Sequence, residues 1–156
     1  MKNYYIIDLI HHKENEKLLI LYQHNQSVFQ NSDSLFSTLS EYYLKDISPI
    51  LCQVDKHDEI FISEFLDNKR ESILFLQSSL SLSRLSQRLQ NYMEFKTPDG
   101  RTGIIRLYDP RAFRNFNNML KLKLKQKQNF WKDIFFIRGW DDINKNYYIE
   151  EHINNV

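Results

Sequence analysis

The sequence predicts a mixed α+β fold of the α/β class: a single compact domain over residues 1–156, with a central mixed sheet, packed helices and one β-hairpin. Short β-branched and aromatic runs alternate with segments of helical period, without a regular repeat. The chain has 156 residues, which is the usual size of one domain. Glycine and proline occur only three times each, so we expect neither linkers nor disordered tracts.

The N-terminal half contains two runs typical of buried strands and several less regular segments. Pro49 cannot donate to a sheet ladder and therefore favours a sheet edge, whereas Asp58 is a good helix N-cap. The expected elements, in order, are a strand at 4–10, a short helix at 14–23, a loop with a helical turn at 25–40, an edge strand after Pro49, a helix at 58–66 and a strand at 72–77.

Residues 81–93 are the clearest predicted helix. One side of this segment is apolar, the other is polar, and Ser81 is a suitable N-cap. The apolar side consists of Leu82, Leu85, Leu89, Tyr92 and Met93. Residues 94–108 then predict a β-hairpin, because the Pro-Asp-Gly sequence at 98–100 is typical of a tight turn.

A long helix is expected to start at Asp109 and Pro110. An N-cap aspartate accepts hydrogen bonds from free backbone N–H groups, and a proline at the first helical position has no N–H to satisfy. Apolar residues recur through this segment at roughly helical spacing, namely Phe113, Phe116, Leu120, Leu124 and Trp131. Two closing strands are expected at 133–140 and 146–149.

Composition excludes several classes of protein. Lys and Arg number 21 and Asp and Glu 20, so the net charge of +1 argues against a dedicated nucleic-acid binder and against a polybasic membrane anchor. Asp8 interrupts the first apolar run, so no secretory signal is expected and the protein is predicted to be cytoplasmic. Cys52 is the only cysteine, which rules out an internal disulfide and predicts a buried, inert thiol.

Most residue types that could carry chemistry have a simpler explanation. The five histidines lack metal-ligand spacing, and no G-x-S-x-G motif is present, so we expect no metal, no cofactor and no serine nucleophile. The carboxylate pairs at 141–142 and 150–151 are expected to be solvated. The basic run contains Lys121, Lys123, Lys125, Lys127 and Lys132, and is interpreted as a solvated helix face rather than a phosphate site.

The segment 106–111 is the densest group of functional side chains. It contains Arg106, Tyr108, Asp109, Pro110 and Arg111. One interpretation is a recognition or catalytic cluster. The favoured one is a capped strand-to-helix junction, in which Asp109 caps the helix and an arginine pairs with the same carboxylate.

The same junction belongs to an ordered set of motifs that resembles a known family. The set runs from Tyr5-Ile6-Ile7-Asp8 through a serine-led helix at 79–89 and the turn at 98–101 to the Arg106–Arg111 segment. Over about residues 4–120 it resembles the Tec-type effector adaptor (chaperone) family of bacterial type VI secretion systems, long catalogued as a domain of unknown function.

The resemblance implies a non-enzymatic adaptor without a cofactor. Such a protein would hold a secretion effector in the cytoplasm and pass it to the spike protein VgrG or its PAAR tip, with protein partners only. The residues expected to contact a partner are Arg84, Arg88, Arg114 and Trp131. Two alternatives remain: a cytoplasmic immunity protein that blocks a toxin, and an enzyme that uses Tyr108, Asp109 and the arginines on an anionic substrate.

Overall fold

The computed structural model of the chain describes residues 1–12, 31–39, 48–55 and 67–152. The helices predicted at 14–23 and 58–66 lie outside the described residues. The fold is mixed α+β, as the sequence predicts, and its strands and helices share a hydrophobic core.

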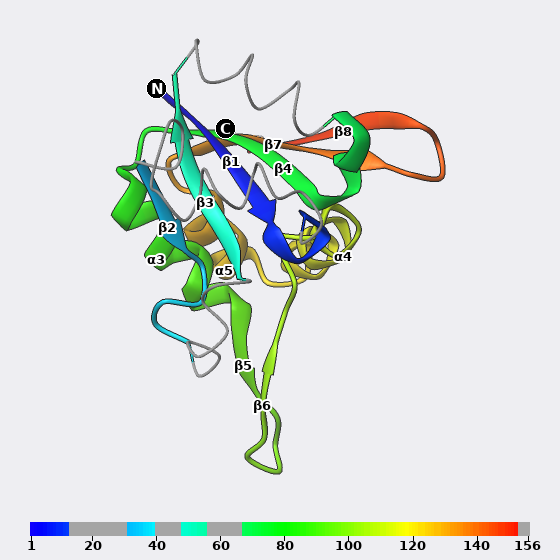
Figure 1. Cartoon of the computed structure of the whole chain (residues 1–156). Coiled ribbons are helices and arrows are strands. Elements are labelled where there is room, and N and C mark those ends of the chain that lie inside the picture. The colour runs from blue at the N-terminus through cyan, green and yellow to red at the C-terminus, as the bar shows by residue number, and fades with distance from the viewer. Residues whose placement is uncertain (13–30, 40–47, 56–66, 153–156) are drawn as a thin grey trace.

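A six-stranded sheet forms the centre of the described structure (Figure 1). Every neighbouring pair of its strands is antiparallel, so the prediction of a mixed sheet is wrong. A parallel pair needs a connection that crosses to the opposite end of the sheet, whereas an antiparallel pair needs one that returns to the same end, and the strand pattern of a sequence does not show which connection is used. In spatial order the strands are β2 (Ser32–Ser34), β3 (Pro49–Val54), β1 (Lys2–Asp8), β4 (Ile73–Ser78), β7 (Ile134–Asp141) and β8 (Asn146–Glu151).

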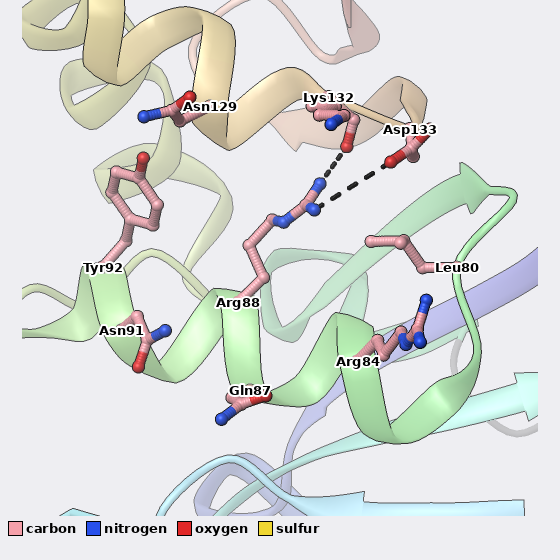
Figure 2. A pocket seen from close by; sticks show the side chains of 9 residues that line it. All are labelled: Leu80, Arg84, Gln87, Arg88, Asn91, Tyr92, Asn129, Lys132 and Asp133. Carbon is pink, nitrogen blue, oxygen red and sulfur yellow. Dashed lines mark hydrogen bonds and ion pairs between the residues drawn. The ribbon is translucent and has the colours of Figure 1, made fainter.

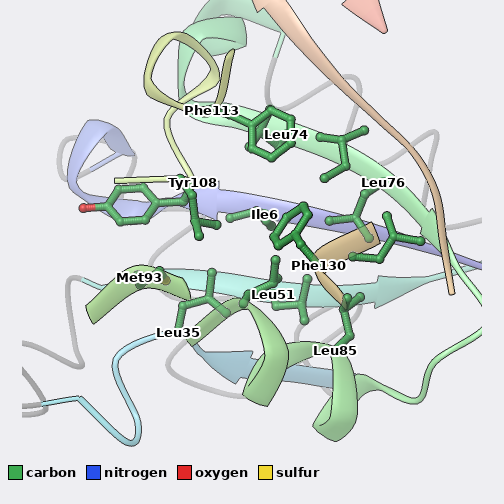
Figure 3. Packing of buried hydrophobic residues seen from close by; sticks show 14 of the residues in the cluster. Ile6, Leu35, Leu51, Leu74, Leu76, Leu85, Met93, Tyr108, Phe113 and Phe130 are labelled. Atoms are coloured by element: carbon green, nitrogen blue, oxygen red, sulfur yellow. The ribbon is translucent and has the colours of Figure 1, made fainter. Parts of the chain in front are cut away.

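Within the described segments, three helices cover one face of this sheet (Figure 1): α3 (Leu82–Met93), α4 (Pro110–Lys121) and α5 (Leu124–Trp131). Figure 3 shows the core between the two layers, where Ile6, Leu51 and Leu74 from the strands face Leu85, Phe113 and Phe130 from the helices. Two 3₁₀ segments, Leu9–His12 and Asp67–Ser72, follow β1 and precede β4. The predicted strands at 4–10 and 72–77 and the helix at 81–93 are confirmed within one or two residues.

Strand β3 is not at the edge of the sheet, contrary to the prediction from Pro49. It pairs with β1 on one side and with the three-residue β2 on the other. Pro49 is tolerated there because it is the first residue of the strand, and its carbonyl accepts a hydrogen bond from the Leu35 N–H at 2.9 Å. Cys52 in this strand is buried, as predicted.

The predicted hairpin is present but shorter than expected. Strands β5 (Glu94–Lys96) and β6 (Thr102–Ile104) form a separate ribbon that projects from the body of the molecule (Figure 1). Gly100 has φ of +85°, as its turn position requires, and the ring of Phe95 lies over Gly103 on the opposite strand. The strand ends at Ile104 because the residues after it turn inward, so that Leu107 and Tyr108 enter the core.

The long helix predicted after Pro110 is two helices. Helix α4 ends at Lys121, Leu122 and Lys123 leave the helical ladder, and α5 starts at Leu124. The break redirects the chain, so that Phe130 and Trp131 are fully buried. Leu124 was expected on the buried face of a continuous helix; instead it is exposed, because the break makes it the first residue of α5, away from the core. The closing strands at 133–150 are confirmed as the β7–β8 hairpin.

Candidate functional site

The junction before α4 is a helix cap, as the favoured interpretation predicts. The Asp109 backbone is extended, and its Oδ1 accepts the Arg111 backbone N–H at 2.9 Å. The Asp109 carbonyl accepts the Phe113 N–H at 2.8 Å, and Pro110 occupies the first helical position. The aspartate–proline step therefore starts α4 in the direction that carries Phe113 into the core.

Two arginines surround the buried Asp109 carboxylate. The Arg111 guanidinium binds both of its oxygens, at 3.2 and 3.0 Å, and the Arg106 guanidinium lies 3.9 Å away. Burial raises the pKa of Asp109, but hydrogen bonds from the Arg111 side chain and backbone outweigh it, so the pKa is lowered overall. The carboxylate is thus ionised and already occupied by intramolecular donors, which fits a structural role.

Arg106 also joins this junction to the end of β1. Its guanidinium lies 3.5 Å from the buried carboxylate of Asp8 and 5.6 Å from the ring centre of Tyr108. Burial raises the pKa of Asp8 overall, although the charges of nearby His11 and Arg106 act in the opposite direction. Arg106, Tyr108, Asp109 and Arg111 therefore form one polar cluster with Asp8, which fixes the start of α4 against the sheet.

Arg114 and Trp131, two of the four residues expected to contact a partner, make intramolecular contacts. Arg114 pairs with Asp141 at 2.7 Å and stacks over Tyr148 at 5.0 Å, so it ties α4 to the β7–β8 hairpin. Asp141 was expected to be solvated but is buried, because Arg114 and the Asn144 side chain and backbone N–H bind its carboxylate.

The prediction that Trp131 contacts a partner is wrong, since its side chain is fully buried. Its Nε1–H donates to the Asn117 Oδ1 at 3.0 Å, and the Asn117 amide donates to Glu150 at 2.8 Å. Trp131 therefore links α5 to α4 and β8. Apolar residues of large size are recognised easily in a sequence, but the burial of each one depends on tertiary packing.

The other two predicted residues, Arg84 and Arg88, lie together on an open groove (Figure 2). One wall is the exposed side of α3, and the other is formed by the end of α5 and the residues before β7. The cavity has a volume of about 550 Å³. Its lining residues are Leu80, Arg84, Gln87, Arg88, Asn91, Tyr92, Asn129, Lys132 and Asp133.

Polar contacts across the groove hold its two walls together. Arg88 donates to the Lys132 carbonyl, and its guanidinium lies 4.0 Å from the Asp133 carboxylate (Figure 2). The Tyr92 hydroxyl donates to the Gln126 carbonyl at 3.0 Å, and burial raises its pKa despite the nearby Arg88. These contacts, all within the chain, span the groove from one wall to the other.

Asp133 holds a backbone conformation that shapes the end of the groove. Its φ is +66°, a region that aspartate tolerates better than most residues. The Ser78 hydroxyl and the Ser79 N–H both donate to the Asp133 carbonyl, at 2.6 and 3.0 Å. These bonds anchor the start of β7 beside α3.

A second hollow of about 530 Å³ continues the groove toward the start of β1. Its lining adds Lys2, Ser79 and Ser81 to Leu80, Arg84 and Asp133, which line both cavities. The Arg84 guanidinium and the Lys132 ammonium have no carboxylate partner among the described residues. The two hollows thus offer unpaired positive charge and side-chain amides on rigid elements.

A domain family described as domain of unknown function DUF4123 matches residues 4–127. The chain belongs to the DUF4123 family. Comparison with curated proteins and with solved structures gave no significant match. The part that matches DUF4123 contains Asp8, all of α3 and the capped junction, whereas β7 and β8 follow it.

Within residues 1–12, 31–39, 48–55 and 67–152, no group of three or more His, Cys, Asp and Glu side chains could hold a metal ion. In the same described segments, no helix has the length and apolar character needed to cross a membrane.

The exposed lysines of the α4–α5 segment were interpreted from the sequence as a solvated face, and Lys121, Lys123 and Lys125 are indeed exposed. Sequence reasoning missed Lys132, Asp133 and Asn129 as neighbours of the α3 arginines. They are more than 40 positions away from Arg88, and no motif marks them. The break after α4 brings them back to α3, and that break was not predicted.

Proposed function

We propose that this DUF4123 protein is a non-enzymatic adaptor or chaperone, which binds a type VI secretion effector in the cytoplasm and aids its loading onto the VgrG and PAAR spike. The observation that carries the proposal is the groove beside α3. It is open to solvent, and most of the side chains that line it are long and polar.

The groove suits an extended polypeptide better than a small molecule. Side-chain amides such as Gln87, Asn91 and Asn129 can both donate to and accept from a peptide backbone. The Arg84 guanidinium pairs with no carboxylate of the described residues, and arginine and tyrosine are enriched at protein interfaces. A small-molecule site is mostly apolar and buries most of its ligand, which an open polar groove cannot do.

The resemblance of the motifs at 79–89 and 106–111 to effector adaptors supports the same function. The Asp109 cluster adds to this support, because its carboxylate is occupied by Arg111 and is not presented to a substrate. In this proposal, the Asp109 cluster has a structural role, fixing α4 against the sheet, and the groove beside α3 binds the partner.

The test is co-expression of the chain with the effector and spike proteins encoded beside it, followed by size-exclusion chromatography. The wild-type chain should co-elute with both. Arg84→Glu should weaken co-elution of the effector without changing the melting temperature, because the Arg84 side chain is exposed. Lys96→Glu, an exposed charge reversal on the β5–β6 hairpin, is the matched control and should bind normally.

Three results would contradict parts of this proposal. Failure of either protein to co-elute refutes the adaptor function. Normal binding by Arg84→Glu places the partner elsewhere than in the groove. Binding of an isolated toxin domain with loss of its toxicity, and no binding of the spike, identifies an immunity protein instead.

A further inference from the structure

The turn between α4 and α5 presents leucine side chains to solvent where a turn normally carries polar residues. Leu122 is 86% exposed and Leu124 is 67% exposed, and Met119 on the last turn of α4 is 43% exposed. The amphipathic pattern of the sequence would bury Leu124, yet the helix break leaves it outside the core. Exposed apolar clusters of this kind mark contact surfaces.

Lysines surround these apolar side chains. Residues 110–132 contain no aspartate or glutamate, and Lys121, Lys123 and Lys125 alternate with the two leucines. Lys123, Lys125 and Lys127 pair with no carboxylate of the residues described here. We call the set Met119, Lys121, Leu122, Lys123, Leu124, Lys125 and Lys127 the Lys/Leu turn.

We propose that the Lys/Leu turn binds the surface of an anionic lipid bilayer reversibly, with Leu122 and Leu124 entering the interface and the lysines contacting lipid phosphates. Apolar side chains ringed by lysines are the combination that such a surface recognises. The inference is independent of the proposed adaptor function, because the turn and the α3 groove share none of their residues.

Two features favour lipid over a specific protein partner. The cations are lysines, which act as flexible point charges suited to a diffuse anionic surface, and none is an arginine, whose planar fork suits a defined carboxylate. The leucines are the most exposed apolar side chains of the Lys/Leu turn, so they can enter a soft interface without a shaped pocket to receive them.

The overall charge of the chain conceals this feature. A net charge of +1 argues against a polybasic anchor, but the positive charge is concentrated in one segment while acidic residues lie elsewhere. Binding through two leucines and a few lysines is weaker than a spanning helix and is reversible.

The test uses the full chain and sedimentation with phosphatidylcholine vesicles that either contain or lack about 30% phosphatidylglycerol. Binding is expected to the anionic vesicles only, and to weaken as salt rises to about 0.5 M. The double variant Leu122→Ser/Leu124→Ser should lower the affinity about tenfold or more, as should Lys123→Gln/Lys125→Gln. All of these side chains are exposed, so the melting temperatures should match that of the wild type.

The matched control is Ile143→Ser. Ile143 is 92% exposed but follows Asp141 and Asp142, so it offers a similar apolar surface next to acidic residues. Its substitution should leave vesicle binding unchanged. The inference is overturned if anionic vesicles do not bind, if neutral vesicles bind equally, or if Ile143→Ser weakens binding as much as the double leucine variant. Dimerisation or protein capture that depends on Leu122 and Leu124, with unchanged vesicle binding, also overturns it.

Discussion

Removing the Asp109 carboxylate tests the role of the capped junction. In Asp109→Ala, the Arg111 backbone N–H loses its acceptor at 2.9 Å, which costs roughly 0.5–2 kcal/mol for an N-cap. The ion pair with Arg111 adds little, because the Arg111 side chain is 66% exposed and is screened by water. We therefore expect a loss of about 1–2 kcal/mol, or about 2–8 °C in melting temperature for a chain of this size.

The effect of Asp109→Ala should depend on pH with a defined sign. The folded-state pKa of Asp109 is lowered, so its contribution is present above the unfolded pKa of about 3.9 and is lost as pH falls through the folded value. Urea unfolding at pH 7 and at pH 3 should therefore show a smaller difference between variant and wild type at pH 3.

Asp109→Asn is the control for this experiment, because asparagine is also a good N-cap but carries no charge. It should lose less stability at pH 7 than the alanine variant does. An Asp109→Ala protein that unfolds at the same urea concentration as the wild type, yet no longer binds its partner, would show that Asp109 is a contact residue and that the capping argument is wrong.

Three further predictions concern buried groups. Burial lowers the pKa of His12 to about 4, so His12 is neutral in the folded chain at a pH where it is protonated in the unfolded chain. The free energy of unfolding should therefore fall by roughly 3 kcal/mol as pH drops from about 6.5 to 4. In urea unfolding, His12→Leu should lack this pH dependence. Trp131→Phe should cost roughly 1–3 kcal/mol in the same assay, because Asn117 loses a buried donor; an unchanged midpoint would exclude that bond. Gly139→Ala should lower the free energy of unfolding by about 1–3 kcal/mol, because a Cβ there would lie 2.5 Å from the Tyr148 Oη. A melting temperature equal to that of the wild type would show that the Tyr148 ring moves aside freely.

The local elements of the fold could be predicted because their signals are local. The β-branched run at 4–10, the amphipathic stripe at 81–93 and the aspartate–proline step each act through neighbouring residues. The cap at Asp109 is therefore found where the sequence places it. The two α3 arginines also share one exposed helix side, as their spacing of four residues indicates.

The sequence-based predictions were wrong where contacts between distant segments determine helix length or side-chain burial. Periodicity favoured one helix from Pro110 to Trp131, but burial of Phe130 and Trp131 requires the break at Leu122 and Lys123. Asp141 was expected to be solvated because it lies near the C-terminus, whereas its environment is set by Arg114, 27 positions away. No pattern within one segment carries information on such distant partners.

By itself, the sequence determined the α+β class, the cap that starts α4 and membership of DUF4123, a domain family of unknown function. Only the tertiary structure decided that Trp131 is in the core, that Arg84 and Arg88 line a groove with Lys132 and Asp133, and that two leucines are exposed in a lysine-rich turn. The physical reason is that hydrogen-bond caps and side-chain periodicity act over a few residues, whereas exposure depends on which distant segments pack together.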